Sequence, residues 1–319
     1  MKRHIKHYFS HGRNWLAIFL VLSFVFVAIA APLISPNDPK APGPLMAVGR
    51  VSDSEPQPPS ENAPLGTMPH QYSVYHSLIW GMRDAMSFGL LVALSVACIG
   101  IVFGAVAGYA GGAVNRIMMR VADSFLAFPV IAAVVFLIQL RVNVINSIGG
   151  LYSVMMANYP GFQVQTQSVI QDLLVRIDPL TLSLILFSWM PYARLVNTLV
   201  IELKETEFIL AARSIGMKPA RIVFRHLLPN AITPAVVLAA RDVGSFVIFQ
   251  ATLTFIGLGG SSIWGYILVV GRDWIIGPGG NVMAYWWVYI PATLAVVLFG
   301  ITWNLFGDGL GELLDPYTR

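Results

Sequence analysis

The sequence predicts an all-α, polytopic membrane protein with six spanning helices. Of its 319 residues, 56% are hydrophobic and 11% are charged, whereas a soluble globular chain carries about 25% charged residues. The mean hydropathy is +0.69. Such a chain has too little polar material to cover a water-facing surface, which excludes a soluble enzyme, a disordered protein and a nucleic-acid-binding protein. Among the stretches without Asp, Glu, Lys or Arg, we take six as the basis of spans, at residues 14–37, 85–115, 124–140, 179–193, 243–271 and 274–307.

The boundaries follow from these stretches, because a spanning helix needs about 20 mostly apolar residues. We expect a cytoplasmic tail at residues 1–14, a first span at 15–35 and an outer loop at 36–84. A cytoplasmic loop is expected at 202–229, an outer insertion at 141–178 and a short tail at 316–319. The five remaining spans are expected at about 86–109, 122–140, 179–201, 230–257 and 286–307.

The distribution of Lys and Arg predicts the orientation, because cytoplasmic loops carry an excess of both. The segment from 38 to 82 is rich in Pro, Ser and Asp and holds only Lys40 and Arg50. Both termini are therefore expected in the cytoplasm, in agreement with an even number of spans. The basic residues gather in the N-terminal tail, in the turn after the second span and in the 202–229 loop: Lys2, Arg3, Lys6, Arg13, Arg116, Arg120, Lys204, Arg213, Lys218, Arg221 and Arg225.

The first apolar stretch is open to a second interpretation. A basic start, an apolar run from Trp15 to Val27 and the small residues Ala28 and Ala30 also fit a cleavable signal peptide. We favour a retained span, because the apolar run continues beyond that site.

Glycines and prolines predict how the spans pack and bend. Gly100, Gly104, Gly108 and Gly112 recur every fourth residue, which places them on one helical face where another backbone can approach closely. Prolines at or near spans remove backbone donors and bend or break helices. These are Pro129, Pro191, Pro234 and Pro291.

Arg241 and Asp242 interrupt an otherwise apolar stretch. Charged residues inside a membrane usually face the bundle interior or a wet cavity, although an interfacial pair near a helix end fits as well. His70 and His76 lack metal-ligand spacing, so we expect them to be solvated. No nucleotide-binding, zinc-protease or serine-hydrolase motif occurs in the chain. We therefore expect no catalytic centre, no metal site and, with the single Cys98, no disulfide.

The loop between the fourth and fifth spans contains two amphipathic segments. Residues 207–215 predict a short helix whose Ala211, Ala212 and Ile215 form a small apolar stripe, and Gly216 stands where a helix stop is expected. A short helix whose apolar stripe consists mostly of small side chains is suited to binding in a groove on a partner protein. An ordinary amphipathic helix at the membrane surface is the alternative.

These residues match the signature of a known family. Ala211-Ala212, then Gly216 after three residues, then Leu228-Pro229, resemble the EAA loop of the permeases of ATP-binding-cassette importers. Leu210 replaces the signature Glu, and His226 replaces the signature Ile. Residues 225–230 (RHLLPN), 108–129, 191–196 (PYARLV), 251–259 (ATLTFIGLG) and 303–316 resemble the peptide/nickel branch, and the C-type subunit of dipeptide and oligopeptide permeases in particular.

The resemblance implies a type I ABC importer permease fold, with a permease core at 85–315. It implies a heterodimer with a second permease in the plasma (inner) membrane lipid, two ATPase subunits that bind ATP and Mg²⁺, and an extracytoplasmic substrate-binding protein. No cofactor is expected in this chain. Arg241 and Asp242, which depart from the apolar or glycine residues of the family, and Gln250 are expected to line the pore. The ATPase contacts would be Glu207, Ala211, Ala212, Arg213, Gly216, Lys218, Arg221, Leu228 and Pro229.

Three departures from the branch leave the cargo open among short peptides, nickel chelates and oligosaccharides. The acidic outer stretch of the family is GTMPHQYSVYHS here, the 141–178 insertion is unusually long, and Gln250 stands where many relatives carry Glu. Two other classes remain as alternatives, an ion-coupled secondary transporter and a membrane scaffold protein without a transport role.

Overall fold

The computed structural model describes residues 11–38, 43–158, 178–276 and 281–314. Almost all of the regular structure is helical, and the two short strands β1 (Thr67–Met68) and β2 (Tyr72–Ser73) form one antiparallel hairpin. The long helices are α2 (Gly12–Ile34), α3 (Val74–Ala110), α4 (Gly112–Leu126), α5 (Val130–Asn158), α12 (Thr233–Phe255) and α14 (Trp286–Leu314). The shorter ones are α7 (Pro179–Phe187), α8 (Met190–Leu203), α9 (Glu207–Ser214), α10 (Pro219–Ile222), α11 (Leu228–Ala231) and α13 (Ile263–Arg272).

Five of the described segments are long and apolar enough to cross a membrane: α2, α3, α7 with α8, α12 and α14. A sixth span exists if α4 and α5 count as one, and this pair is bent by 76°. The span expected at 122–140 is thus divided between two helices, as the prediction of a bend or break at Pro129 implies. The bend falls at residues 127–129, where Pro129 lacks the N–H that would continue the helix.

Several helix boundaries also differ from expectation, and α14 continues to Leu314, past the expected end at residue 307. Helix α3 begins at Val74, well before residue 86, because the Ser73 side chain accepts a hydrogen bond from the His76 N–H and caps it. Helix α5 continues to Asn158, so the first half of the expected 141–178 insertion is helical. Residues 159–177 of that insertion, 1–10 of the expected N-terminal tail and the C-terminal tail lie outside the described residues, whereas residues 12–14 belong to α2 and not to a tail.

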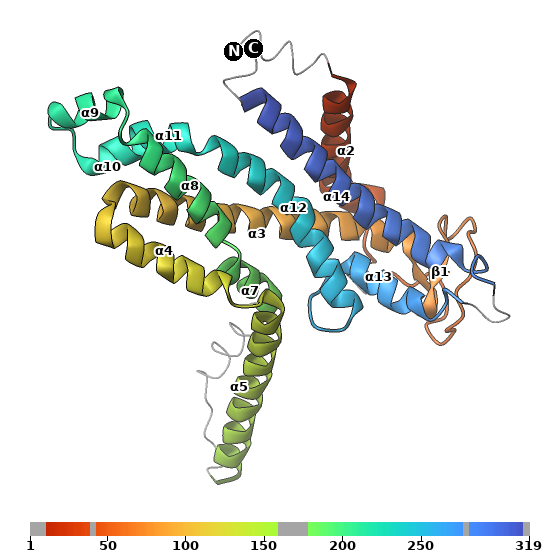
Figure 1. Ribbon diagram of the computed structural model, residues 1–319. Coiled ribbons are helices and arrows are strands. Elements are labelled where there is room, and N and C mark those ends of the chain that lie inside the picture. Colours follow the sequence, from red (N-terminus) through yellow and green to blue (C-terminus); the bar gives the residue numbers. More distant parts are fainter. Residues whose placement is uncertain (1–10, 39–42, 159–177, 277–280, 315–319) are drawn as a thin grey trace.

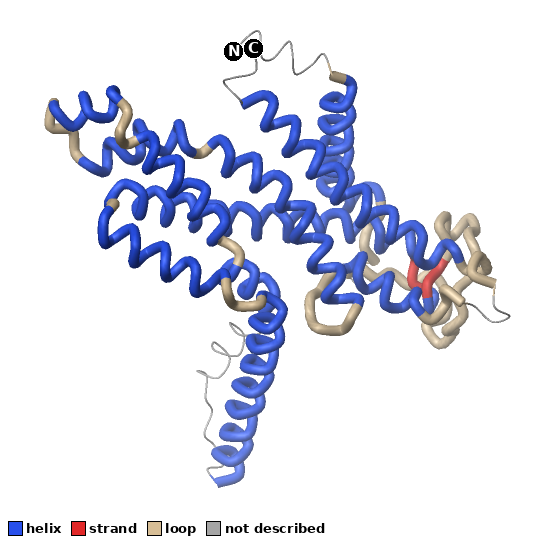
Figure 2. Tube along the Cα trace, viewed as in Figure 1, coloured by secondary structure: helices blue, strands red, loops and turns tan. Residues whose placement is uncertain are grey.

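Helix α3 lies at the centre of the bundle and contacts α2, α8 and α12, while α12 also packs along α14 (Figure 1). Helix α5 runs away from the other long helices. The helices α9 and α10 lie at one end of the bundle, and the β1–β2 hairpin with its loops lies at the opposite end (Figure 2). The two loops that were expected on opposite sides of a membrane are thus separated by the length of the bundle.

The glycine stripe of α3 packs against α8 at three of its four predicted positions. A Cβ on Gly100 or Gly104 would lie 2.4 Å from the Trp189 carbonyl oxygen or 2.3 Å from that of Ala193, respectively. At Gly108 the nearest atom of α8 would be 2.9 Å away. The prediction is wrong for Gly112, because a Cβ at this position would meet no atom within 4 Å outside its chain neighbours. Its φ of +52° belongs to the tight turn between α3 and α4, which a glycine adopts without steric cost.

Helix α2 is packed into the bundle rather than set apart from it. Its small residues Ala17, Ala28 and Ala31 are buried, and the Phe24 ring meets the Phe299 ring of α14 edge to face at 5.4 Å. At its start, Asn14 is fully buried and donates to the Glu312 carboxylate at 2.8 Å. These contacts support a retained first span.

The expectation of solvated histidines is wrong for His76. Its ring is fully buried, with Ser35 Oγ at 2.7 Å from Nδ1 and the Gly43 carbonyl oxygen at 3.0 Å from Nε2. It therefore joins the end of α2 and the loop between α2 and α3 to the start of α3. His70 is exposed, as expected.

Candidate functional site

Helix α9 has a well-defined start and stop. Glu207 lies in its first turn, where a carboxylate interacts favourably with the helix dipole. At the other end, the Gly216 N–H donates to the Arg213 carbonyl oxygen at 2.9 Å and the Met217 N–H to that of Ala212 at 3.1 Å. These two bonds form a Schellman motif around Gly216, whose φ is +73°. The predicted helix and its glycine stop are confirmed.

The buried and solvent-exposed faces of α9 carry different residues. Ile209 and Ala212 are buried against the rest of the chain, with 0% and 6% of their surface exposed. Phe208, Ala211 and Ile215 follow the helical spacing on the outer side, and Ile215 is 78% exposed. Sequence reasoning missed Phe208, although its spacing of three and seven residues from Ala211 and Ile215 was the available signal.

The other expected contact residues fall into two groups. Glu207, Arg213, Lys218, Arg221 and Pro229 are exposed, whereas Ala212 is buried and Leu228 is half-buried. The buried Ala212 therefore positions the helix instead of offering a contact surface. The Arg213 guanidinium lies over the Tyr109 ring of α3 at 5.3 Å, which ties α9 to the bundle.

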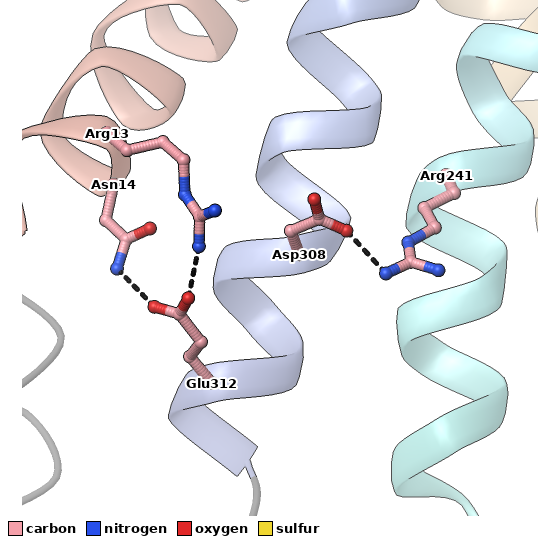
Figure 3. A network of polar contacts seen from close by, with 5 residues as sticks. All are labelled: Arg13, Asn14, Arg241, Asp308 and Glu312. Carbon is pink, nitrogen blue, oxygen red and sulfur yellow. Dashed lines mark hydrogen bonds and ion pairs between the residues drawn. The ribbon is translucent and has the colours of Figure 1, made fainter.

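The adjacent residues Arg241 and Asp242 of α12 bind different neighbours. Asp242 is partly buried and accepts a hydrogen bond of 2.6 Å from the Tyr192 hydroxyl of α8. Arg241 forms an ion pair with Asp308 of α14, where both side chains remain nearly half exposed (Figure 3). In the same view, Arg13 and Asn14 of α2 both contact Glu312, one turn further along α14. Arg241, Asp242 and Glu312 therefore each have a partner on another helix.

Gln250 lies inside the chain, although it was expected to line a pore. Only 1% of its surface is exposed, and its side-chain carbonyl oxygen has no partner among the described residues. The exposed face of α12 carries other residues instead, at helical spacing. They are Arg241, Ser245, Ile248 and Thr252.

A cavity of about 760 Å³ lies beside the start of α12. Its walls come from α8, α11, α12 and the end of α14, and Arg241 is its one charged lining residue. The remaining walls are mostly apolar, with Asn230 and Thr233 as the other polar contributions. Among the described residues, no group of three or more His, Cys, Asp or Glu could hold a metal ion.

The architecture is that of a multi-pass helical membrane protein with a projecting helix at one end of the bundle. Comparison with known families adds the identification. Residues 100–319 match the family described as "binding-protein-dependent transport system inner membrane component", and the chain belongs to this family. It is a permease subunit of an ATP-driven importer.

Several curated relatives are similar over most of the chain. A dipeptide transport system permease protein of Alkalihalophilus pseudofirmus is 29% identical over 95% of this chain and 86% of its own length. An oligopeptide transport system permease protein of Bacillus subtilis is 26% identical over 97% and 87%. A glutathione transport system permease protein of Pectobacterium atrosepticum is 31% identical over 76% and 69%. Their likeness supports the predicted resemblance to the C-type peptide permeases.

Proposed function

We propose that this chain forms half of the translocation pathway of an importer of short peptides. A second permease subunit would complete the pathway, two ATPase subunits would bind ATP and Mg²⁺, and an extracytoplasmic protein would deliver the cargo. The chain itself would carry out no catalysis. The peptide assignment rests on relatives whose names specify dipeptides, oligopeptides and glutathione.

The observation that carries this proposal is the solvent-exposed face of α9. Phe208 and Ile215 expose 47% and 78% of their surface at the tip of the bundle, where basic residues flank them. Large apolar side chains on a short, capped helix are suited to a groove on a partner. In this proposal, α9 docks on an ATPase subunit.

The connections of α9 suggest how docking would reach the pathway. Only residues 204–206 separate α9 from α8, and the segment from α10 to α11 leads from it into α12. The Tyr192–Asp242 hydrogen bond joins α8 to α12. A shift of α9 would therefore move both helices together, which suits a pathway that alternates between outward and inward access.

The proposed location is the plasma (inner) membrane, with both termini in the cytoplasm. The Lys and Arg distribution supports this orientation. The placement of α9 and the β1–β2 hairpin at opposite ends of the bundle is consistent with it.

The test is co-purification followed by transport. The tagged chain is purified from its native membrane, its co-purifying chains are identified, and the complex is reconstituted with the binding protein. We expect ATPase subunits in the complex and ATP-dependent uptake of a radiolabelled dipeptide. Uptake that needs no ATPase would support a secondary transporter instead, and absence of transport would support a scaffold.

A matched pair of variants addresses the docking face. Ile215→Asp places a charge in the proposed contact and should remove the ATPase subunits from the purified complex. Ile276→Asp is the control, because Ile276 is similarly exposed at 71% but lies after α13, outside the α9 region. Retention of the ATPase by the Ile215→Asp variant would contradict docking through α9.

A further inference from the structure

Arg241 of α12 and its ion-pair partner Asp308 of α14 lie on two of the candidate spans, beside the 760 Å³ cavity. Arg241 lines the cavity, and the two side chains remain 46% and 40% exposed. Charged groups on a spanning helix are costly against lipid, so we expect an accessible pair to face water, protein or cargo. By contrast, the carboxylate of Asp242 is partly buried and is used within the chain by Tyr192.

The surrounding helices hold the pair in place without covering it. The aliphatic part of the Arg241 side chain packs against α14 at Gly307, where a Cβ would lie 2.5 Å from Arg241 Cγ. A residue with a side chain at position 307 would push the guanidinium away from Asp308, one residue further along α14. The glycine therefore sets the geometry of the pair.

The exposed face of α12 beyond Arg241 is mixed in polarity. Ser245 and Thr252 are exposed four and eleven residues beyond Arg241, which places all three within roughly 40° of one another on the helix, and the exposed Ile248 lies between them. The two hydroxyls donate to carbonyl oxygens of their own helix, at 3.4 and 2.7 Å. This face therefore offers polar groups on both sides of one apolar residue.

We infer that Arg241 and Asp308 form an exchangeable site for a zwitterionic cargo, in which the ion pair opens and each partner takes one charged end of the solute. The Arg241 guanidinium binds the cargo carboxylate, and Asp308 binds the cargo ammonium group. The ion pairs of Arg241 and Asp308 with the cargo replace the single ion pair between them, so that no charged group is left unpaired. The guanidinium also matches the geometry of a carboxylate, because it can donate two parallel hydrogen bonds. This inference rests on the proposed peptide-import function and deepens it.

The assembled complex in proteoliposomes provides the test, with a radiolabelled dipeptide that has both termini free. The variant carries Arg241→Gln and Asp308→Asn together, so that neither charge is left unpaired. The matched control carries Arg194→Gln and Asp123→Asn, which neutralises the ion pair between α8 and α4 that is similarly exposed, at 51% and 47%, and lies outside the cavity lining.

We expect at least a roughly tenfold loss of uptake in the Arg241/Asp308 variant, as the loss of charge-assisted hydrogen bonds to the cargo implies. Assembly and basal ATP hydrolysis should persist, and the control should transport like the wild type. Equal uptake by both double variants would overturn the site, and so would an Arg241/Asp308 variant that no longer assembles, because the pair would then be structural. If the wild-type complex imports no dipeptide, the proposed function fails instead.

A second measurement leaves the ion pair intact. Benzoylphenylalanine replaces Val237 in the cavity wall or Leu22 on the exposed face of α2. On illumination during transport, the labelled dipeptide should cross-link at position 237 and not at position 22. A complex that imports the dipeptide without cross-linking at position 237 in any nucleotide state would place the cargo elsewhere.

Discussion

The Tyr192 hydroxyl of α8 donates a 2.6 Å hydrogen bond to the Asp242 carboxylate of α12. Tyr192 is fully buried and Asp242 is partly buried, so water has little access to replace this bond. The bond therefore fixes the relative position of two helices that the proposed mechanism moves together.

Removal of the hydroxyl should destabilise the protein. In Tyr192→Phe, Asp242 loses its donor, and an unsatisfied partly buried group costs about 1–3 kcal/mol. We expect a lower Tm for the purified protein in detergent. Asp242→Asn should be milder, because an amide oxygen still accepts the bond. An unchanged Tm in Tyr192→Phe would show that Asp242 has another partner or access to water.

Close packing between α3 and α8 yields a second prediction. In Gly104→Ala the new methyl group would lie 2.3 Å from the Ala193 carbonyl oxygen, a backbone atom that cannot move alone. We expect a loss of roughly 1–3 kcal/mol, as for other overpacked interiors, measured by thermal unfolding. Gly12→Ala is the control, since a Cβ at position 12 would meet no neighbouring atom within 4 Å. Equal stability of the two variants would mean that the helices separate without cost.

The sequence predicted features that depend on local composition. Apolar runs located the spans, and glycine spacing identified the face of α3 that meets α8, because a period of four residues maps directly onto one helical face. The prediction was wrong for Gly112, because the same spacing continued past the end of α3 into the turn that follows. The position of Gly216 after a short helix was enough to predict its helix stop.

Features that depend on tertiary contacts were not predictable in the same way. His76 is buried because Ser35 and Gly43, 41 and 33 residues away, provide its polar partners. The partners of Arg241 and Asp242 lie 67 and 50 residues away. The burial of Gln250 likewise follows from how helices pack, which no local pattern encodes.

The orientation of the chain gives a third prediction. In a Cys98→Ala background, cysteines at Ser54 and Ser214 should react differently with a membrane-impermeant maleimide added to spheroplasts that expose the outer face of the plasma membrane. Ser54 lies in the loop that we expect on the outer side and Ser214 at the end of α9, and both are exposed. We expect labelling of position 54 alone, and labelling of both after the spheroplasts are lysed. Labelling of position 214 in intact spheroplasts would reverse the proposed topology.

Gly216 permits a final prediction about the coupling segment. Nothing lies within 4 Å of a Cβ at this position, so a substitution would be opposed by the backbone conformation and not by a clash. At a φ of +73°, a side chain costs roughly 1–2 kcal/mol, and Asn tolerates this conformation better than Ala or Val. Loss of 1–2 kcal/mol from the capped form lowers its relative population by about 5–30-fold. We therefore expect retention of the ATPase subunits to fall in the order Gly, Asn, Ala, Val, measured by co-purification at equal expression. If Gly216→Val retains the ATPase as well as the wild type does, the Schellman cap is not needed for docking.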